Sequence, residues 1–308
     1  MRRTLPTGRT AQFRSRTVAR RLLWGVLFAS PWIIGFLWFS VYPILSSLYY
    51  SFTSYDVLTP PVFVGFGNYQ FAFRDPYFWT SLYNTVYFVL LAVPGSVATG
   101  FFLAVLMNLQ IKFRSAFRTV FFLPSIIPVT ATAMLWLWMY HPQHGVLNGM
   151  LRLMGLPRLP WLSSPELAKP SLILIHLWCS GGLMVIFLAA LQDVPRHLYE
   201  AAKIDGAGWW AQMCHITIPM VTPAILFNLL TGLIGAFQYF TLARILTNGG
   251  PVAATEFYSL YLYRCAFDYF RMGYASALSW LLFILVVVVS LIIFRSSARW
   301  VYYAGGDA

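Results

Sequence analysis

The chain has 308 residues, of which 59% are hydrophobic and only 10% are charged. A soluble domain carries about 25% charged residues, so this composition excludes an ordinary soluble protein and indicates a lipid environment. The net charge of +12 does not indicate a nucleic-acid partner, because seven of the 21 basic residues lie in the first 21 positions and most others flank apolar runs.

Residues 1–21 are expected to form an Arg-rich cytoplasmic tail. The apolar run after it is too long for a signal peptide, and no small-residue cleavage site closes it, so we expect an uncleaved first membrane helix. Runs free of Asp, Glu, Lys and Arg predict six helices of membrane-spanning length. They lie at roughly 22–42, 82–109, 119–140, 170–191, 219–243 and 272–294.

These spans predict an all-α integral membrane protein with a six-helix transmembrane domain over residues 22–303 and a short tail at 304–308. A membrane β-barrel is excluded, because the runs do not alternate polar and apolar residues. With the N-terminus inside, fourteen of the 21 basic residues face the cytoplasm. Both termini and the loop at 192–218 are therefore predicted to be cytoplasmic.

The chain offers no evident source of energy and no catalytic constellation. None of the predicted spans contains a carboxylate, which a proton-driven carrier usually needs. None of the three lysines directly follows Gly, as a P-loop requires. His176 has no second ligand at helical spacing, so no metal site is expected. The chain is predicted to bind no cofactor and to be no enzyme by itself.

One charged segment interrupts the apolar chain between the fourth and fifth spans. Asp193 before Pro195 is expected to begin a short helix, no breaker interrupts residues 196–204, and Gly206 can end the helix with a positive φ. By its local features the segment is also compatible with an ordinary solvated hairpin. The residues expected to contact a partner are Glu200, Ala201, Ala202, Asp205 and Gly206.

The motif "EAA", followed by "DGA" and "I-x-x-P", resembles the cytoplasmic motif of permease subunits in ATP-binding cassette importers. Ile218 stands where that family usually has Leu. The stretch "LQDVPRHLYEAAKIDGA" resembles the sugar-permease branch. So do "FVGFGNY", "FFLPSIIP", "LTNGGP", "FRMGYASALS" and the terminal "WVYY". The resemblance covers nearly all of residues 22–303.

This resemblance implies a six-helix type I importer permease in the inner or plasma membrane of a bacterium or archaeon. The implied partners are a second homologous permease, two copies of a cytoplasmic ATPase that bind ATP and magnesium, and an extracytoplasmic solute-binding protein. The Glu-Ala-Ala helix would be the coupling helix, seated in a cleft of the ATPase. The chain would contact the lipid bilayer and no nucleic acid.

The resemblance also implies that solute contacts gather midway along the helices that flank the coupling loop. The candidates are Trp178, Gly182, Gly235, Gln238 and Tyr239. We expect Gly232, Gly235 and Tyr239 to share one helical face by their spacing, where small residues beside an aromatic ring suit a sugar. Close helix packing through the small residues is the alternative.

Arg244 directly follows the fifth span. It could anchor the helix end at the lipid headgroups, or it could face the outer mouth of the pathway and favour an anionic sugar.

Two other functions remain as alternatives to a sugar-importer permease. One is a self-sufficient secondary carrier or channel, against which the missing membrane carboxylates count. The other is a membrane-bound enzyme, against which the missing catalytic residues count.

Overall fold

The computed structural model describes residues 9–109 and 112–302, and within these ranges the fold is almost entirely helical. Four helices are long and apolar enough to cross a membrane, and the number rises to six if each of two bent helix pairs is one span. An antiparallel pair of two-residue strands, β1 (Thr53–Ser54) and β2 (Val62–Phe63), is a small departure from the expected all-α class. The predicted tail at 304–308 lies outside the described residues.

The helices follow the chain in this order: α1 (Arg9–Phe36), α2 (Tyr42–Ser51), α3 (Gly67–Arg74), α4 (Pro76–Asn108), α5 (Arg114–Ile126), α6 (Val129–Met139), α7 (Val146–Leu153), α8 (Pro165–Trp178), α9 (Gly181–Gln192), α10 (Arg196–Ile204), α11 (Trp209–Gln212), α12 (Ile218–Phe237), α13 (Thr241–Leu246), α14 (Tyr258–Tyr263) and α15 (Met272–Ser297).

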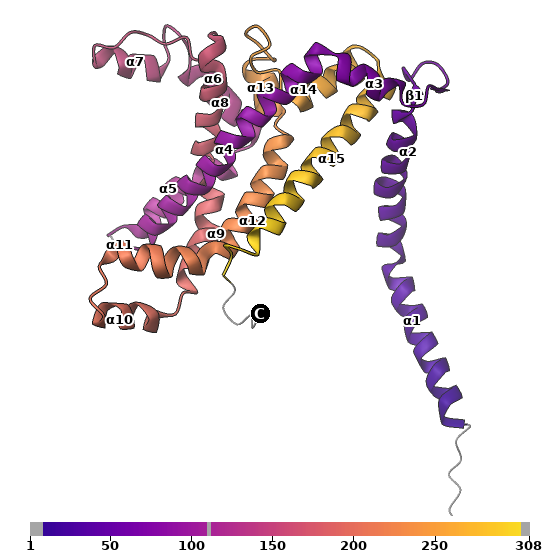
Figure 1. Ribbon diagram of the computed structural model, residues 1–308, viewed down its shortest axis with the longest axis horizontal. Helices are drawn as coiled ribbons and strands as arrows, with labels where there is room; N and C mark the ends of the chain where they lie inside the picture. Colours follow the sequence, from indigo (N-terminus) through magenta and orange to yellow (C-terminus); the bar gives the residue numbers. More distant parts are fainter. Residues whose placement is uncertain (1–8, 110–111, 303–308) are drawn as a thin grey trace, which may run out of the picture.

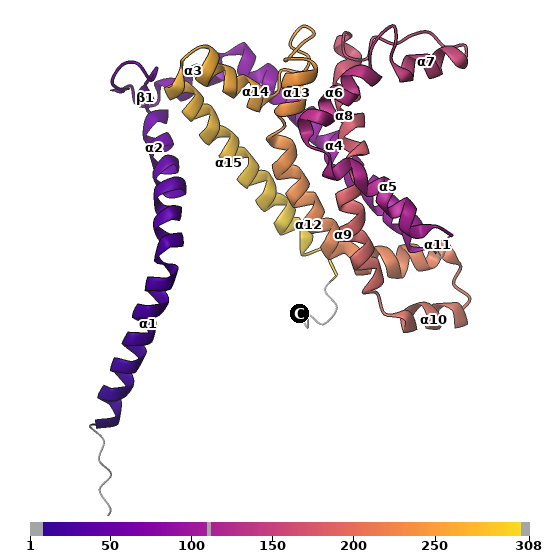
Figure 2. The ribbon, with the colours of Figure 1, turned by 180° about the vertical axis from the view of Figure 1, so that it is seen from behind.

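The long helices run between two ends of the molecule (Figure 1). Helices α3, α7, α13 and α14 gather at one end, which we call the outer end. Helices α10 and α11 lie at the opposite end, which we call the inner end. Helix α1 begins and α15 ends on the side of the inner end, as Figure 2 shows from behind.

Helix α4 is the central element of the bundle. Asp75 accepts a hydrogen bond from the backbone N–H of Tyr77 at 2.9 Å, and Pro76 occupies the first turn, so the helix begins with a side-chain cap. An outer apolar cluster joins α4 to α14 and α15, a middle cluster joins it to α8 and α12, and an inner cluster joins it to α9 and α12. Fully buried members of these clusters are Tyr258, Phe88 and Phe187, respectively.

Two of the predicted spans are bent at a break, and the bounds of a third are shifted. Helices α5 and α6 meet at 101°, because Ile127 before Pro128 adopts an extended conformation. Helices α8 and α9 meet at 44° across Cys179 and Ser180. The fifth span starts earlier than predicted and ends earlier, since a continuous helix runs over Trp209–Phe237.

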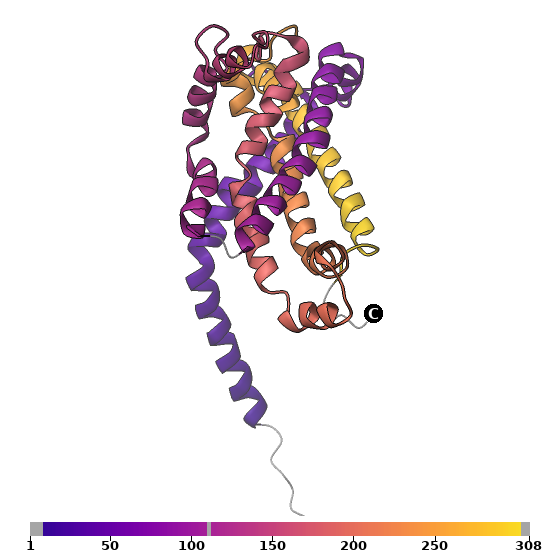
Figure 3. The ribbon, with the colours of Figure 1, turned by 90° about the vertical axis from the view of Figure 1, so that its left-hand side faces the viewer.

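The first helical segment forms an arm that stands apart from the bundle. Helix α1, a π-helical turn over Leu37–Val41 and α2 leave the body at its outer end and diverge from it toward the inner end (Figure 1). Figure 3 shows that α1 extends past the inner end of the body. At the outer end the indole N–H of Trp280 donates to Ser47 Oγ at 3.2 Å. No residue of the arm's most apolar stretch is buried. An exposed apolar face of this size indicates contact with lipid or with another protein.

Candidate functional site

The predicted partner-contact helix exists as α10, which follows α9 and precedes α11 in the chain and lies below α11 at the inner end (Figure 1). Its end follows the expectation: Gly206 has a φ of 77°, and the Ala207 N–H donates to Ala202 O at 2.8 Å. Its start differs from the expectation. Asp193 terminates α9, Pro195 precedes α10, and no side chain caps the new helix.

Helix α10 presents its charged residues to the outside. No residue of α10 is buried, and Ile204 is 87% exposed. Only one side of the helix, with Leu198, Tyr199 and Ala202, is half-buried. The exposed residues at the predicted contact are Glu200, Ala201, Asp205 and Gly206.

The two carboxylates of this segment have no ion-pair partner in the part of the chain that the structure describes. There, Arg264 and Glu256 at the outer end form the one ion pair. Glu200 and Asp205 are therefore available to basic groups of another molecule, with which a carboxylate forms strong charge-assisted hydrogen bonds.

The candidate solute contacts of the fourth span lie at the break between α8 and α9. Trp178 ends α8, and its ring packs edge-to-face on Trp136 of α6, with 5.6 Å between the centroids. Gly181 allows close packing, because a Cβ there would collide with Phe121 O. Gly182 is more open, since the nearest atom to its added Cβ would be Ser125 Cβ at 3.9 Å.

The structure separates the candidates of the fifth span. Because α12 ends at Phe237, Tyr239 does not continue the helical face of Gly232 and Gly235, and the predicted shared face is wrong. An added Cβ at Gly232 would touch Val93 of α4 at 3.4 Å, whereas Gly235 has open space around it. Gly232 therefore serves packing, and Gly235 remains a candidate for a pathway contact.

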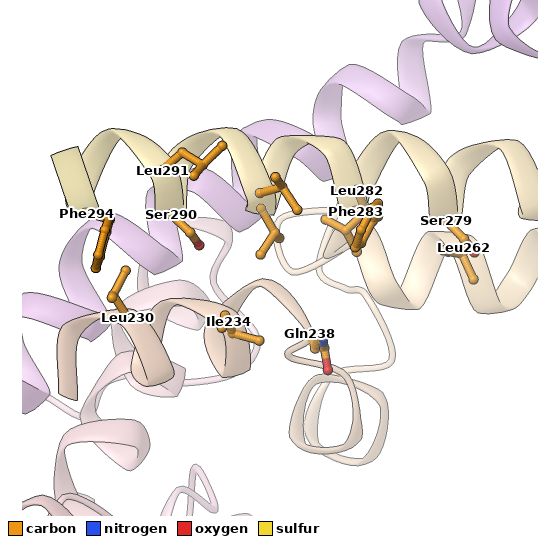
Figure 4. Close-up of a pocket in the computed structure, with 12 residues that line it drawn as sticks. Leu230, Ile234, Gln238, Leu262, Ser279, Leu282, Phe283, Ser290, Leu291 and Phe294 are labelled. Carbon is orange, nitrogen blue, oxygen red and sulfur yellow. The ribbon is translucent and has the colours of Figure 1, made fainter. Parts of the chain in front are cut away.

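Gln238 and Tyr239 lie in different surroundings. The Tyr239 ring packs in the core, 4.2 Å from the Phe88 ring centroid and 5.4 Å from that of Phe257. Gln238 is exposed at the end of α12, in a mostly apolar groove of about 690 Å³ between α12 and α15 (Figure 4). Leu230 and Ile234 of α12 and Phe283 of α15 also line this groove.

Arg244 belongs to α13, beyond the break that ends the fifth span. Its guanidinium lies 4.2 Å from the ring centroid of Tyr263 and 5.9 Å from that of Phe240. Tyr263 in turn packs on Phe267, which is 55% exposed. Arg244 is thus held against a row of aromatic rings at the outer end by cation–π contacts.

Sequence reasoning missed a polar cluster at the outer end. The Asp75 carboxylate accepts hydrogen bonds from the hydroxyls of Tyr261 and Tyr274. The buried Glu256 carboxylate is paired with Arg264 at 2.6 Å. Burial raises the pKa of Glu256, and the Arg264 guanidinium opposes this rise. The available signal was the scarcity of acids, since only nine occur in the chain.

Arg264 also fixes the loop that carries "LTNGGP". Its guanidinium donates to Asn248 O at 2.6 Å, and Gly249, with a φ of 82°, lies directly against the Glu256 carboxylate. Within the described ranges no group of three or more His, Cys, Asp or Glu side chains is placed to hold a metal ion.

Comparisons with known proteins agree on one family. The model of the family described as "Binding-protein-dependent transport system inner membrane component" matches residues 96–302. The probable ABC transporter permease protein YesP of Bacillus subtilis is 42% identical, over 96% of this chain and 97% of its own length. The sulfoquinovosyl glycerol transport system permease protein SmoG of Agrobacterium fabrum is 34% identical, over 89% and 90% of the two chains.

A solved structure is also similar. It is a bacterial alginate ABC transporter in complex with an alginate pentasaccharide-bound periplasmic protein. One of its chains matches with a TM-score of 0.80 at 26% identity, covering 92% of this chain and 96% of its own.

Proposed function

This chain belongs to the family of binding-protein-dependent transport system inner membrane components, and on that premise we propose that it forms half of the solute pathway of an ATP-driven saccharide importer. It has the type I importer permease fold. The energy comes from two copies of a cytoplasmic ATPase, which bind the ATP and magnesium, and the solute comes from an extracytoplasmic binding protein. The complex resides in the inner or plasma membrane of a bacterial or archaeal cell.

The observation that carries this proposal is the exposure of α10 at the inner end. The helix has no buried residue, and it offers two carboxylates without an ion-pair partner among the described residues. Ala201 and Gly206 leave room for a close approach, because an alanine side chain is short and a Cβ at Gly206 would meet nothing within 4 Å. Such a surface suits a basic cleft on an ATPase subunit.

The exposed arm and the groove support pairing with a second, homologous permease. Large apolar side chains of the arm are exposed, among them Phe28 at 81% and Trp32 at 71%. The groove between α12 and α15 is lined mainly by apolar residues. A partner permease would cover the apolar surface of the arm and of the groove, both of which this chain leaves exposed.

A saccharide as the solute is supported by the names of the relatives and by the side chains at hand. The relative SmoG is named as a sulfoquinovosyl glycerol permease, and the similar structure is an alginate transporter. On this chain we assign the pathway contacts to Trp178, Gly182, Gly235, Gln238 and Arg244. Tyr239 supports them from the core by packing on Phe88.

A self-sufficient carrier or channel is the alternative, and the placement of the acids disfavours it. Helix α8 begins before the predicted span and so includes Glu166, but this residue is exposed in the first turn. Asp75 caps the outer start of α4. Neither carboxylate lies midway along a span, where a proton relay needs one.

Purification from native membranes tests the proposal. The tagged chain should bring down an ATPase and a homologous permease, and the purified chain alone should neither hydrolyse ATP nor accumulate solute in liposomes. Uptake by the lone chain driven by an ion gradient would establish the alternative instead.

A further inference from the structure

Helix α10 has no buried residue, and Tyr199 is its residue that packs against the inner apolar cluster. Tyr199 is partly buried against this inner apolar cluster, whose buried members include Val194 and Val221. Its hydroxyl oxygen lies 2.9 Å from Thr217 Oγ1. Thr217 is only 5% exposed and ends a π-helical turn over Met213–Thr217 that leads directly into α12.

The direction of this hydrogen bond follows from the second contact of Thr217. Thr217 Oγ1 lies 3.3 Å from Gln212 O, a carbonyl oxygen that can only accept. The single hydroxyl hydrogen of Thr217 is therefore committed to Gln212. With Thr217 donating to Gln212, the Tyr199 hydroxyl is the donor that completes the Tyr199–Thr217 contact.

Further bonds close this contact into a ring. The Gln212 side-chain N–H donates to Ala207 O at 2.8 Å, and the Ala207 N–H donates to Ala202 O at 2.8 Å. The ring thus leaves α10 at Tyr199, passes through the start of the α12 span, and returns to α10 at Ala202. Trp209–Phe237 is one continuous helix, and it also carries Gly235.

We propose that the Tyr199–Thr217 hydrogen bond links α10 to α12 so that the two helices move as one body. Tyr199 and Thr217 are then positioning residues for coupling. The inference rests on the proposed function. It goes further by assigning the transmission of motion to two hydroxyls that lie behind the exposed contact surface. Short π-helical insertions occur frequently at functional sites, and the one before α12 holds Thr217 toward Tyr199.

The test uses the full chain, purified with the ATPase that accompanies it, and Gly235→Cys as a reporter. A cysteine fits there because the position has open space. Its modification by a water-soluble maleimide, followed by peptide mass spectrometry, is compared without nucleotide and with Mg-ATP plus vanadate. Tyr199→Phe and Thr217→Val each remove one hydroxyl while keeping the side chain's shape. Tyr69→Phe is the matched control, since it breaks a 2.8 Å hydroxyl contact with Ser51 at the outer end.

We expect both hydroxyl variants to retain the ATPase. In each variant the nucleotide-dependent change in labelling should be about fivefold smaller than in the parent, as the loss of one hydrogen bond allows. The double variant should be no worse than either single variant. Thr217→Ser keeps the hydroxyl and should respond like the parent, as should Tyr69→Phe.

Two results would overturn the inference: a full nucleotide response in Tyr199→Phe and Thr217→Val, or loss of the ATPase from both. A parent chain that brings down no ATPase would instead refute the proposed function.

Discussion

The outer and inner ends of this molecule use polar groups in opposite ways. At the outer end, Asp75 and Glu256 are buried. Asp75 is held by hydroxyls from a distant part of the chain, and Glu256 is held by the Arg264 guanidinium eight residues further on. At the inner end, Glu200 and Asp205 are exposed and have no ion pair within the described residues. One set of helices connects the two ends.

The difference indicates which end is rigid. The buried Asp75 carboxylate is held by hydroxyls from two distant segments, and a buried group held in this way favours one arrangement of the elements around it, so the outer end resembles a fixed frame. A helix with exposed charges and one short ring of hydrogen bonds can move as a unit when a partner binds it. The molecule therefore combines a fixed outer end with a movable inner helix.

Two glycines with similar backbones give the sharpest test of this comparison. Gly249 and Gly206 have φ values of 82° and 77°, but an added Cβ collides with Glu256 only at Gly249. Gly249→Ala should lower the free energy of unfolding by at least about 3 kcal/mol, because it displaces a buried ion pair. Gly206→Ala should cost only about 1 kcal/mol, for its backbone strain. Heat stability of the purified chains measures both, and equal losses would abolish the distinction between the two ends.

Removing the outer charge should have the next largest effect. Glu256→Gln leaves Arg264 without its ion pair, and we expect a loss of about 2 kcal/mol in stability, since Arg264 still donates to Asn248. Heat stability of the variant against the parent measures this loss.

Glu256→Gln should also change how the stability of the chain depends on pH. Because burial raises the pKa of Glu256 above its ordinary 4.5 although the Arg264 guanidinium opposes the rise, ionising Glu256 costs more in the folded chain than in the unfolded chain. This cost is absent below a pH of 4.5 and lowers stability as pH rises through the raised pKa. The advantage of the parent over Glu256→Gln should therefore shrink with rising pH. An advantage that grows instead would mean that the folded protein favours the charged form.

Charge reversal at the inner end should leave the stability of the chain unchanged and weaken its binding to the ATPase. We expect Glu200→Lys to reduce the ATPase recovered with the chain by about tenfold, because it places the wrong sign opposite a basic cleft. Gly206→Asp should act in the same direction, whereas Gly206→Asn, which tolerates the same backbone, should be milder. Glu200→Gln is the neutral control. Full recovery of the ATPase with Glu200→Lys would make this segment a solvated linker.

The smallest effect is expected at Arg244. Arg244→Gln removes a guanidinium that lies against Tyr263, and uptake of an acidic saccharide should fall by about fivefold, as the loss of a charge contact of about 1 kcal/mol implies. Arg244→Lys keeps the charge but loses the planar stacking, so its uptake should lie between that of the parent and that of Arg244→Gln. If the transported solute is neutral, or its uptake does not change, Arg244 serves as an anchor of the outer end.

The sequence alone was informative where the cause is local. Long runs without charge predict membrane-length helices because burying an unpaired charge in lipid is costly. Gly206 predicted the end of α10 because a positive φ is easiest without a Cβ. The solvated hairpin and the partner-contact helix could not be distinguished locally, since both need an exposed charged segment.

Only the tertiary structure decided how these helices combine. It ended α12 at Phe237, which moved Tyr239 into the core and left Gln238 at a groove. It joined Asp75 to Tyr261 and Tyr274, which lie 186 and 199 residues away in sequence. It also brought Tyr199 to Thr217 across the inner loop. Such contacts depend on the packing of whole helices against one another, and periodicity and propensity along one chain carry no information about that packing.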